Sequence, residues 1–152
     1  MRKGFGLLIC MVFLFSIASA EQTVALPESR YVIDVPDGLE YNPAEDGDDG
    51  IQAYISDTLE MDYWSYPAAE NAPTLRERAK KLAADGADVE IRRVNGIEML
   101  VYRVTDEADG APCIGYAFMD GTRIVEVFFW YATQEAADLT KTIMESIREN
   151  NS

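Results

Sequence analysis

The chain has 152 residues with 27 acidic and 13 basic side chains and no histidine, which gives a formal net charge of −14. A surface this acidic repels nucleic acid and anionic lipid, so nucleic acid is not an expected partner and a charged partner is expected to be cationic. Without histidine, the chain lacks the usual general base of Ser-His and Cys-His sites and the commonest neutral metal ligand. We therefore expect no metal, no other cofactor and no hydrolase site of these types.

The start of the chain has the three parts of a secretory signal peptide. Arg2 and Lys3 provide positive charge, residues 7–17 are apolar, and a run of small residues ends at Ala20. The apolar run is shorter than the roughly 20 residues that a membrane-spanning helix needs, so cleavage near Ala20 is expected rather than stable membrane insertion. Because cleavage removes two cations and no acid, the exported single domain, 21–152, has a net charge of −16.

Cleavage leaves Cys113 as the only cysteine of the mature chain, so no internal disulfide is expected. Two interpretations of this thiol stay open. It is a small buried hydrophobic residue of a strand, or it pairs with the same residue of a second chain. Mass spectrometry without reductant distinguishes a monomer from a covalent dimer.

Three strands are expected before the first helix, over residues 30–35, 51–58 and 60–66. A capping box then marks a helix start, since the hydroxyl of Thr74 can accept from the amide of Glu77 while the Glu77 carboxylate accepts from the amide of Thr74. Gly86 suits the end of this helix, because a residue with positive φ commonly follows a last helical turn. The helix has a basic face that we expect to be solvated, made of Arg76, Arg78, Lys80 and Lys81.

The dipeptide Asn95-Gly96 predicts a β-hairpin, because both residues tolerate the positive φ angles of a type I′ turn. Strands over 88–94 and 97–106 flank the turn. A two-residue turn pairs Asp88 with Arg103 at the open end of the hairpin, and this pair of opposite charges favours the register.

Asp120-Gly121 predicts a second hairpin by the same argument, between two apolar strands. A two-residue turn there pairs Gly115 with Glu126 and Cys113 with Phe128. Alternation then places the small residues on one face of the hairpin and large residues on the other.

An amphipathic helix capped by Thr133 follows, with an inward apolar stripe of Ala136, Leu139, Ile143 and Ile147. Strands joined by tight turns pair antiparallel, and amphipathic helices bury their apolar stripes against a sheet. The chain therefore predicts an α+β fold, a central antiparallel sheet of about six or seven strands with helices packed on its faces.

Glu126 is unusual because it lies between two valines of an apolar strand, on the same face as Gly115 and Cys113. One interpretation is a ligand pocket in which Glu126 is the polar anchor and the small residues form the floor. Phe128 and Trp130 would then be its walls. These five residues are the candidate ligand-binding site, and none of them is assigned a catalytic role.

The alternative interpretation gives Glu126 a structural role. The small residues then admit a helix close to the sheet, because helices must cover this sheet in any case. Glu126 is then salt-bridged, with Arg92 or Arg103 as nearby cations, or it lies at a solvated rim.

The acidic segment Glu45–Gly50 is rich in the oxygen ligands that calcium prefers. It does not match the D-x-[DN]-x-[DN]-G loop in any register, since Gly47 would occupy a ligand position. We therefore expect a solvated acidic loop and no metal site, with calcium binding as the alternative. The chain also has no GxSxG elbow, phosphate-binding glycine loop or CxxC pair, so no catalytic residue is predicted.

Two parts of the chain, YVIDVPDGLEYN at 31–42 and the closing hairpin with its helix ending in IMESI at 143–147, resemble the PsbP-like superfamily. The extrinsic photosystem II subunit, a Ran-binding nuclear import factor and many small exported bacterial proteins of unknown role share its fold. The resemblance covers most of residues 30–148 and implies a central antiparallel sheet with helices on both sides. Because functions across this fold differ, it implies no site residue.

Together these observations predict an exported, non-catalytic domain that binds a protein or a small ligand. The surfaces that could do so are the loop 39–50, the basic helix face and the small-residue dent at Gly115. Two other classes stay open. One is an enzyme that uses carboxylates such as Glu126, and the other is a structural or assembly subunit of an envelope complex.

Overall fold

The structure, a computed structural model, describes residues 21–43 and 50–151. The predicted signal peptide, 1–20, and the acidic stretch 44–49 lie outside the described residues, and so does the calcium interpretation of that stretch. The described part contains, in chain order, β1 (Glu21–Ala25), β2 (Tyr31–Pro36), β3 (Glu40–Tyr41), β4 (Gln52–Ile55), β5 (Leu59–Pro67), α1 (Leu75–Ala84), β6 (Asp88–Val94), β7 (Ile97–Thr105), β8 (Pro112–Asp120), β9 (Arg123–Tyr131), α2 (Gln134–Glu145) and β10 (Arg148–Glu149).

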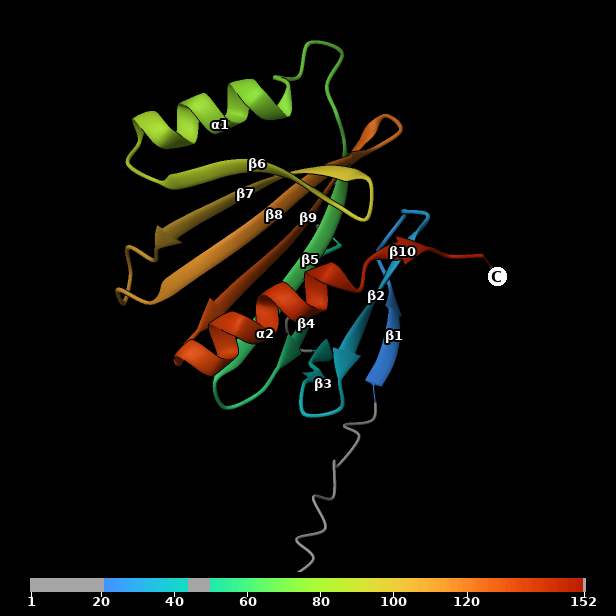
Figure 1. Cartoon of the computed structure of the whole chain (residues 1–152), viewed down its shortest axis with the longest axis vertical. Helices are drawn as coiled ribbons and strands as arrows, with labels where there is room; N and C mark the ends of the chain where they lie inside the picture. Colours follow the sequence, from blue (N-terminus) through green and yellow to red (C-terminus); the bar gives the residue numbers. More distant parts are fainter. Residues whose placement is uncertain (1–20, 44–49, 152) are drawn as a thin grey trace, which may run out of the picture.

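A seven-stranded sheet in the order β3-β4-β5-β9-β8-β7-β6 forms the centre of the molecule (Figure 1). Its neighbouring strands all pair antiparallel. A three-stranded sheet in the order β1-β2-β10 lies beside it. The prediction of an α+β fold around an antiparallel sheet of six or seven strands is confirmed.

The smaller sheet contains strands that the sequence pattern does not predict. The expected strand over 30–35 is β2, which pairs with β1 on one side and with β10 on the other. β1 buries only Val24 among its five residues, and β10 has two exposed residues, so neither shows the alternation that marks a half-buried strand. β1 and β10 form because the backbone groups along both edges of β2 are available for strand pairing.

The β6–β7 hairpin has the predicted register. Asn95 and Gly96 have φ angles of +49° and +86°, as a type I′ turn requires at both central positions. Asp88 pairs with Arg103, so the predicted pairing is confirmed along the whole hairpin.

The β8–β9 hairpin has a different turn from the predicted one. Asp120 pairs with Arg123, which leaves Gly121 and Thr122 as the central residues. Gly121 has a φ of +61° at the first central position, as in a type II′ turn. Asp120 stays in the strand because its carboxylate accepts hydrogen bonds from the Ser29 hydroxyl and the Arg30 amide, at 2.9 and 2.8 Å.

The predicted pairs of this hairpin are therefore wrong by two residues. Gly115 lies opposite Phe128 instead of Glu126, and Cys113 lies opposite Trp130 instead of Phe128. Because a shift of two residues preserves alternation, each side chain still lies on its predicted face.

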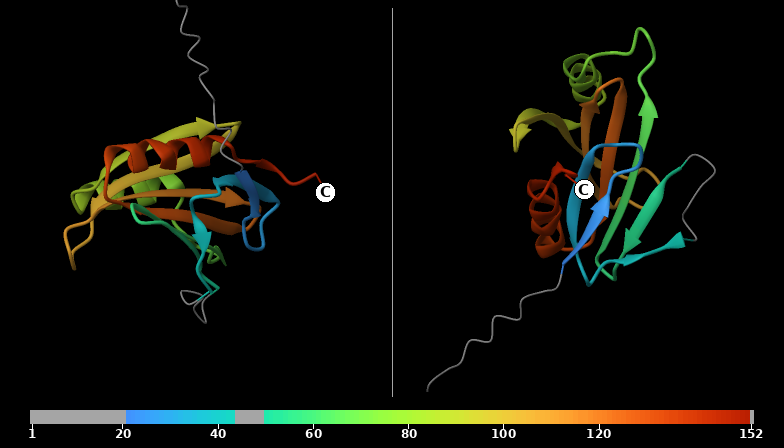
Figure 2. Two further views of the ribbon diagram at one scale, coloured as in Figure 1. Left: turned by 90° about the horizontal axis from the view of Figure 1, so that it is seen from below. Right: turned by 90° about the vertical axis from the view of Figure 1, so that its right-hand side faces the viewer.

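The main core lies on one face of the large sheet, under α2 and the three-stranded sheet (Figure 2). The helix contributes apolar residues at the predicted spacing, and the small sheet contributes Ile33 and Val35. Large residues of β8 and β9 meet them, namely Ile114, Tyr116, Phe118, Val125, Val127 and Phe129. The face of the hairpin that carries uniformly large side chains is thus the core face.

Helix α1 packs on the opposite face, at the β6–β7 end of the sheet. It starts with the predicted capping box of Thr74 and Glu77, and Gly86 follows its last turn with a φ of +95°. Leu75 and Ala79 are its buried contacts, in a small cluster that includes Ala117 of β8. Helices therefore cover the two faces only in part. In the described ranges, neither helix has the length and apolarity to cross a membrane.

Candidate functional site

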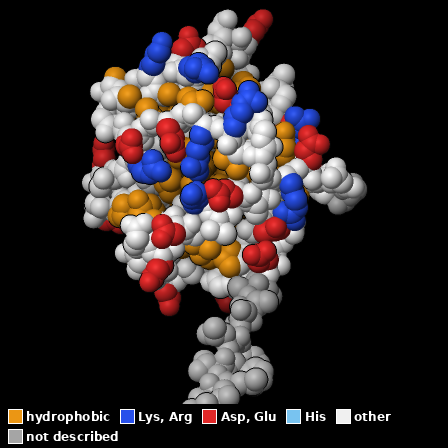
Figure 3. All heavy atoms as spheres, viewed as in Figure 1, with side chains coloured by type: hydrophobic (Ala, Val, Ile, Leu, Met, Phe, Trp, Pro, Cys, Tyr) orange, Lys and Arg blue, Asp and Glu red, His pale blue; other side chains and the backbone are white. Residues whose placement is uncertain are grey.

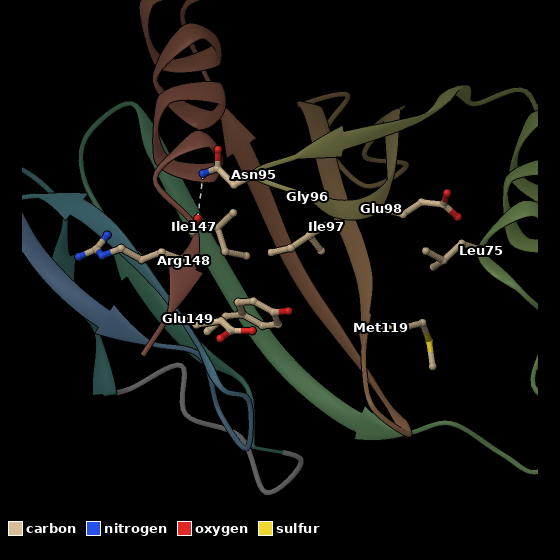
Figure 4. Close-up of a pocket in the computed structure, with 10 residues that line it drawn as sticks. Leu75, Asn95, Gly96, Ile97, Glu98, Met119, Ile147, Arg148 and Glu149 are labelled. Carbon is tan, nitrogen blue, oxygen red and sulfur yellow. Dashed lines mark hydrogen bonds between the residues drawn. The ribbon is translucent and has the colours of Figure 1, made fainter. Parts of the chain in front are cut away.

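Two adjoining cavities of about 670 Å³ each open at the end of the large sheet that carries the turns of both hairpins. They share Leu75, Glu98 and Met119, so together they form one hollow, which we call the hairpin-end groove. The first cavity is also lined by Tyr31, Asn95, Gly96, Ile97, Ile147, Arg148 and Glu149 (Figure 4). The second is also lined by Ala68, Ala69, Glu70, Ala72, Pro73, Thr74, Arg76, Gly121 and Thr122.

The floor of the groove is apolar. In Figure 4, the side chains of Leu75, Ile97, Met119 and Ile147 surround the space of the first cavity. Met119 is 41% exposed, and Tyr41 is the only other large apolar side chain of the described residues that is exposed. An exposed thioether on an apolar floor can adapt its shape to several ligands, because methionine has three rotatable bonds and a polarizable sulfur.

The rim of the groove carries both signs of charge. Arg76 Nη2 lies 3.8 Å from Glu98 Oε2, and both side chains are solvent-exposed. A pair of this kind contributes only about 0–1 kcal/mol, so either partner can turn to an incoming charged group. Arg148 is held more firmly, because its guanidinium donates to both carboxylate oxygens of Asp34 at 2.7 and 2.8 Å.

Asn95 fastens the β6–β7 turn to the end of α2. Its side-chain amide donates to the carbonyl oxygens of Glu145 and Ile147, at 2.8 and 2.9 Å, as Figure 4 shows for Ile147. Both acceptors are at the end of a helix, where carbonyl groups lack intrahelical partners. One wall of the groove is therefore fixed by side-chain hydrogen bonds in addition to strand pairing.

The other hairpin is fastened to the loop that leads into β2. Asp120 accepts from Ser29 and Arg30, and the Arg30 guanidinium lies 3.0 Å from its other carboxylate oxygen. Residues 90 positions apart in the chain are thereby joined next to Met119. Both turns that border the groove are thus held in place before any ligand arrives.

The groove is lined by apolar, charged, amide and hydroxyl side chains. No cysteine, serine or histidine is among the residues that line it. Within 21–43 and 50–151, no three cysteine or acidic side chains gather as metal ligands would. An apolar floor with a few polar groups at its rim is the usual composition of a ligand site.

Glu126, the centre of the predicted ligand site, is buried and hydrogen-bonded to three side chains. Arg78 Nη2 donates to Oε1 at 2.7 Å, the Tyr66 hydroxyl donates to Oε2 at 2.9 Å, and the Tyr102 hydroxyl lies 3.4 Å from Oε1. The carboxylate therefore joins α1 to β5 and β7. This network agrees with the structural interpretation, in which Glu126 is salt-bridged, and the cation comes from α1.

Arg92 and Arg103, the cations expected near Glu126, lie on the other face of the sheet. Arg92 and Arg103 line a pocket beside Tyr116 on the core face, whereas Glu126 faces α1. Arg78 was assigned to the solvated face of the helix, yet its side chain is only 19% exposed. Successive residues of a strand face opposite sides of the sheet, and Arg92 of β6 and Arg103 of β7 face the side opposite to Glu126.

An aromatic ring, and not a helix, occupies the dent at Gly115. Tyr102 lies directly across from Gly115 on β7. A Cβ atom at Gly115 would lie 2.5 Å from both Cε1 and Oη of Tyr102, so only glycine leaves room for this ring. The Tyr102 ring also contacts Phe128, with 6.0 Å between ring centroids.

The remaining predicted site residues have partners within the protein. Cys113 is free and buried, in agreement with its interpretation as a small hydrophobic residue, and burial raises the pKa of its thiol to about 11. Trp130 Nε1 donates to Asp106 at 3.1 Å, and its ring packs edge-on against Phe128 at 4.6 Å. The ligand role of Glu126, Gly115, Cys113, Phe128 and Trp130 stays a prediction.

The protonation states around Glu126 follow from burial and from its charge. Burial and the carboxylate both raise the pKa of Tyr102 well above its ordinary value, and they raise the pKa of Tyr66 in the same direction. Burial alone would lower the pKa of Arg78, but the carboxylate of Glu126 raises it above its ordinary value. The tyrosines are therefore neutral donors and the arginine is a cation.

Sequence reasoning did not find the groove, because its lining comes from the ends of several elements. Leu75 starts α1, Ile97 starts β7, and Ile147 follows α2. Each was interpreted as part of an apolar stripe or strand. The one local signal is Met119, a large apolar residue next to a turn on an otherwise small-residue face.

The arrangement of strands and helices defines a PsbP-like fold. The solution structure of cyanobacterial PsbP (CyanoP) from Synechocystis sp. PCC 6803 matches with a TM-score of 0.60 and 12% sequence identity, over 87% of this chain and 94% of that one. A crystal structure from Bacteroides thetaiotaomicron VPI-5482 matches with a TM-score of 0.55 and 8% identity, over 81% of this chain and 46% of that one. At these identities the likeness establishes the fold alone.

No protein-family model matches the chain, and no curated protein matches it in sequence. The solved structures above confirm the fold that the resemblance in residues 31–42 and in the closing hairpin implies. Since one fold hosts many functions, the function must be argued from the site.

Proposed function

We propose that the mature chain, 21–152, is an exported, non-catalytic domain that binds a short extended segment of a partner protein in the hairpin-end groove. The observation that carries this proposal is the pair of adjoining cavities of about 670 Å³ each, with an apolar floor and the exposed Met119 at their shared boundary. Cavities of this size and lining are typical of ligand-binding sites.

An extended polypeptide matches the double form of the groove. Side chains two positions apart in an extended chain point the same way and lie about 7 Å apart. Two cavities with a shared boundary can each take one such side chain, as in other grooves that recognise extended peptides by alternate residues. The partner segment therefore has two apolar residues separated by one residue.

The charge of the domain supports a basic partner. The rim of the groove carries three acids, Glu70, Glu98 and Glu149, against two arginines, Arg76 and Arg148, and the mature chain has a net charge of −16. A negative field speeds the encounter with a cationic segment and suppresses acidic competitors. We therefore expect lysine or arginine on both sides of the two apolar residues.

The sequence of residues 1–20 supports export with cleavage after Ala20, because it has the charged, apolar and small-residue parts of a signal peptide. Cleavage there would keep all the strands of the described residues, including β1 and its pairing with β2. Expression of the full chain in a bacterium with a periplasm tests this part. N-terminal sequencing of the periplasmic product should begin at Glu21, and an uncut chain retained in the cytoplasm would contradict it.

Peptide selection tests the groove. Immobilised mature domain is used to select from a library of random peptides, and the affinities of selected peptides are measured by fluorescence anisotropy. We expect peptides with two alternate apolar residues flanked by lysine or arginine. Met119→Ser should weaken their binding at least about tenfold, because it removes the apolar contact shared by both cavities.

Two control variants test whether a loss of peptide binding is specific to the groove. Tyr41→Ser removes an apolar side chain of similar exposure, 43%, on β3 and should leave binding unchanged. Glu98→Lys should weaken binding of basic peptides, whereas Glu40→Lys makes the same charge change outside the groove and should have little effect. Selected peptides that bind Met119→Ser as well as the unaltered domain would refute the proposal.

A further inference from the structure

A second pocket, of about 260 Å³, lies on the core side of the large sheet between α2 and strands β6 to β8. Three of its lining residues are cations from three different elements, Arg92 of β6, Arg103 of β7 and Lys141 of α2. Figure 3 shows lysine and arginine side chains near the middle of this face, with aspartate and glutamate side chains beside them. The pocket lining itself holds three cations and one acid, Asp138, in a chain with 27 acids and 13 bases.

Arg92 is held in place but is incompletely hydrogen-bonded. Its guanidinium lies over the ring of Tyr116, 5.6 Å from the centroid, and Tyr116 is buried at 1% exposure. The Nε of Arg92 is buried and has no hydrogen-bond partner. A guanidinium that lies against an aromatic ring is preorganised to bind an anion through its terminal nitrogens, because little side-chain entropy is lost on binding.

Acids near the two arginines neutralise them only in part. Glu90 lies 3.5 Å from Arg92 and 4.0 Å from Arg103, and Asp88 lies 3.3 Å from Arg103. Both acids are largely exposed, at 44% and 76%. Exposed pairs of this kind contribute about 0–1 kcal/mol, so an oxyanion inside the pocket can compete for the arginines.

The α2 wall adds a cation, an acid and neutral hydrogen-bonding groups. Lys141 is exposed and lies 3.7 Å from Glu145, again a weak surface pair. Gln134 Nε2 donates to Asp138 Oδ1 at 3.0 Å, so this carboxylate, still an anion, has a hydrogen-bond partner on its own helix. The lining therefore contains three cations against one acid.

We propose that this pocket binds a small oxyanion group that carries two negative charges, of the phosphate-monoester class. Two guanidinium groups and one ammonium group surround a tetrahedral oxyanion better than a planar monocarboxylate, because they approach it from three elements. A volume of about 260 Å³ holds one such group and a small attached residue. The site is separate from the hairpin-end groove, and no residue lines both.

Calorimetric titration of the mature domain with inorganic phosphate at low ionic strength tests this proposal. Phosphate and glycerol 3-phosphate should bind, acetate should bind at least about tenfold more weakly, and added sodium chloride should weaken phosphate binding. Arg103→Gln should lower the phosphate affinity at least tenfold. Lys141→Gln, at an exposed helix position that cannot unfold the domain, should lower it about threefold.

Arg93→Gln is the matched control, since this exposed arginine is next to Arg92 on β6 and points to the other face. It should leave phosphate binding unchanged, and so should Met119→Ser in the separate groove. The absence of phosphate binding at low ionic strength would overturn the proposal. An equal loss in Arg93→Gln and Arg103→Gln would overturn it as well, because the effect would then reflect net charge and not the pocket.

Discussion

Replacement of Gly115 by alanine tests the packing of the Tyr102 ring against the sheet. The added Cβ would lie 2.5 Å from Cε1 and Oη of Tyr102, with Cζ nearer still. No pair of carbon atoms tolerates this distance, so either the ring or the backbone of β8 must move. The ring is 9% exposed and packs among α1 residues, and it also lines an open pocket of about 380 Å³ beside Arg78 and Leu82. It can turn toward that pocket only by giving up its contacts with the sheet.

The expected cost follows from the two possible responses. If the ring swings into solvent, the lost burial of an aromatic side chain costs about 2–3 kcal/mol. If the strands shift instead, overpacking costs about 1–3 kcal/mol. We expect the free energy of unfolding to fall by about 2–3 kcal/mol, which lowers the melting temperature by about 6–12 °C for a domain of this size.

Urea denaturation followed by circular dichroism measures this change, and Gly38→Ala is the control. A Cβ at Gly38 meets nothing within 4 Å, and its φ is not positive. This substitution should leave stability unchanged or raise it by up to about 1 kcal/mol, because alanine restricts the unfolded chain.

A double-mutant cycle with Tyr102→Ala identifies the cause. Once the ring is removed, the added methyl group at Gly115 has room, so Gly115→Ala should cost less than about 0.5 kcal/mol in that background. If Gly115→Ala costs the same with and without the Tyr102 ring, the proposed steric conflict is not the reason for the loss.

Three further predictions concern charged and titratable groups. Glu126→Gln leaves the largely buried guanidinium of Arg78 without its anion, so the free energy of unfolding in urea should fall by about 3 kcal/mol. Because burial raises the pKa of the Cys113 thiol to about 11, the folded domain at pH 8 should react with a thiol reagent about 100-fold more slowly than the unfolded chain, and equal rates would contradict the burial. The hydrogen bonds from Arg148 lower the pKa of Asp34 in the folded state. This pair therefore stabilises the domain above the unfolded pKa of about 3.9 and loses its effect as the pH falls through the lower folded value, so the stability difference between the domain and Asp34→Asn should be constant above about pH 5 and shrink below pH 4.

Local sequence signals predicted the elements whose causes are themselves local. The capping box at Thr74 and the turn at Asn95-Gly96 depend on a few adjacent residues, and both occur as expected. Alternation also assigned each residue of β8 and β9 to the correct face. It could not detect that Asp120 stays in its strand, because the reason is a contact with Ser29 and Arg30, 91 and 90 positions away.

The partners of Glu126 could not be predicted for a related reason. The sequence shows a carboxylate in an apolar strand and several arginines elsewhere, but not which arginine crosses from a helix to the sheet. Arg78 does so because α1 lies over the face that carries Gly115 and Ala117. The hairpin-end groove is harder still, since it is a space between elements, and no residue pattern within one element encodes it.

The pairing of β2 has a consequence for the order in which the domain folds. β2 pairs with β1 at residues 21–25 and with β10 at 148–149, and Arg148 also holds Asp34 and Thr23. The small sheet therefore joins segments at opposite ends of the domain and closes only when residue 149 is available. A contact with so large a sequence separation is among the last to form. The small sheet is therefore completed late, after the strands of the two hairpins have paired.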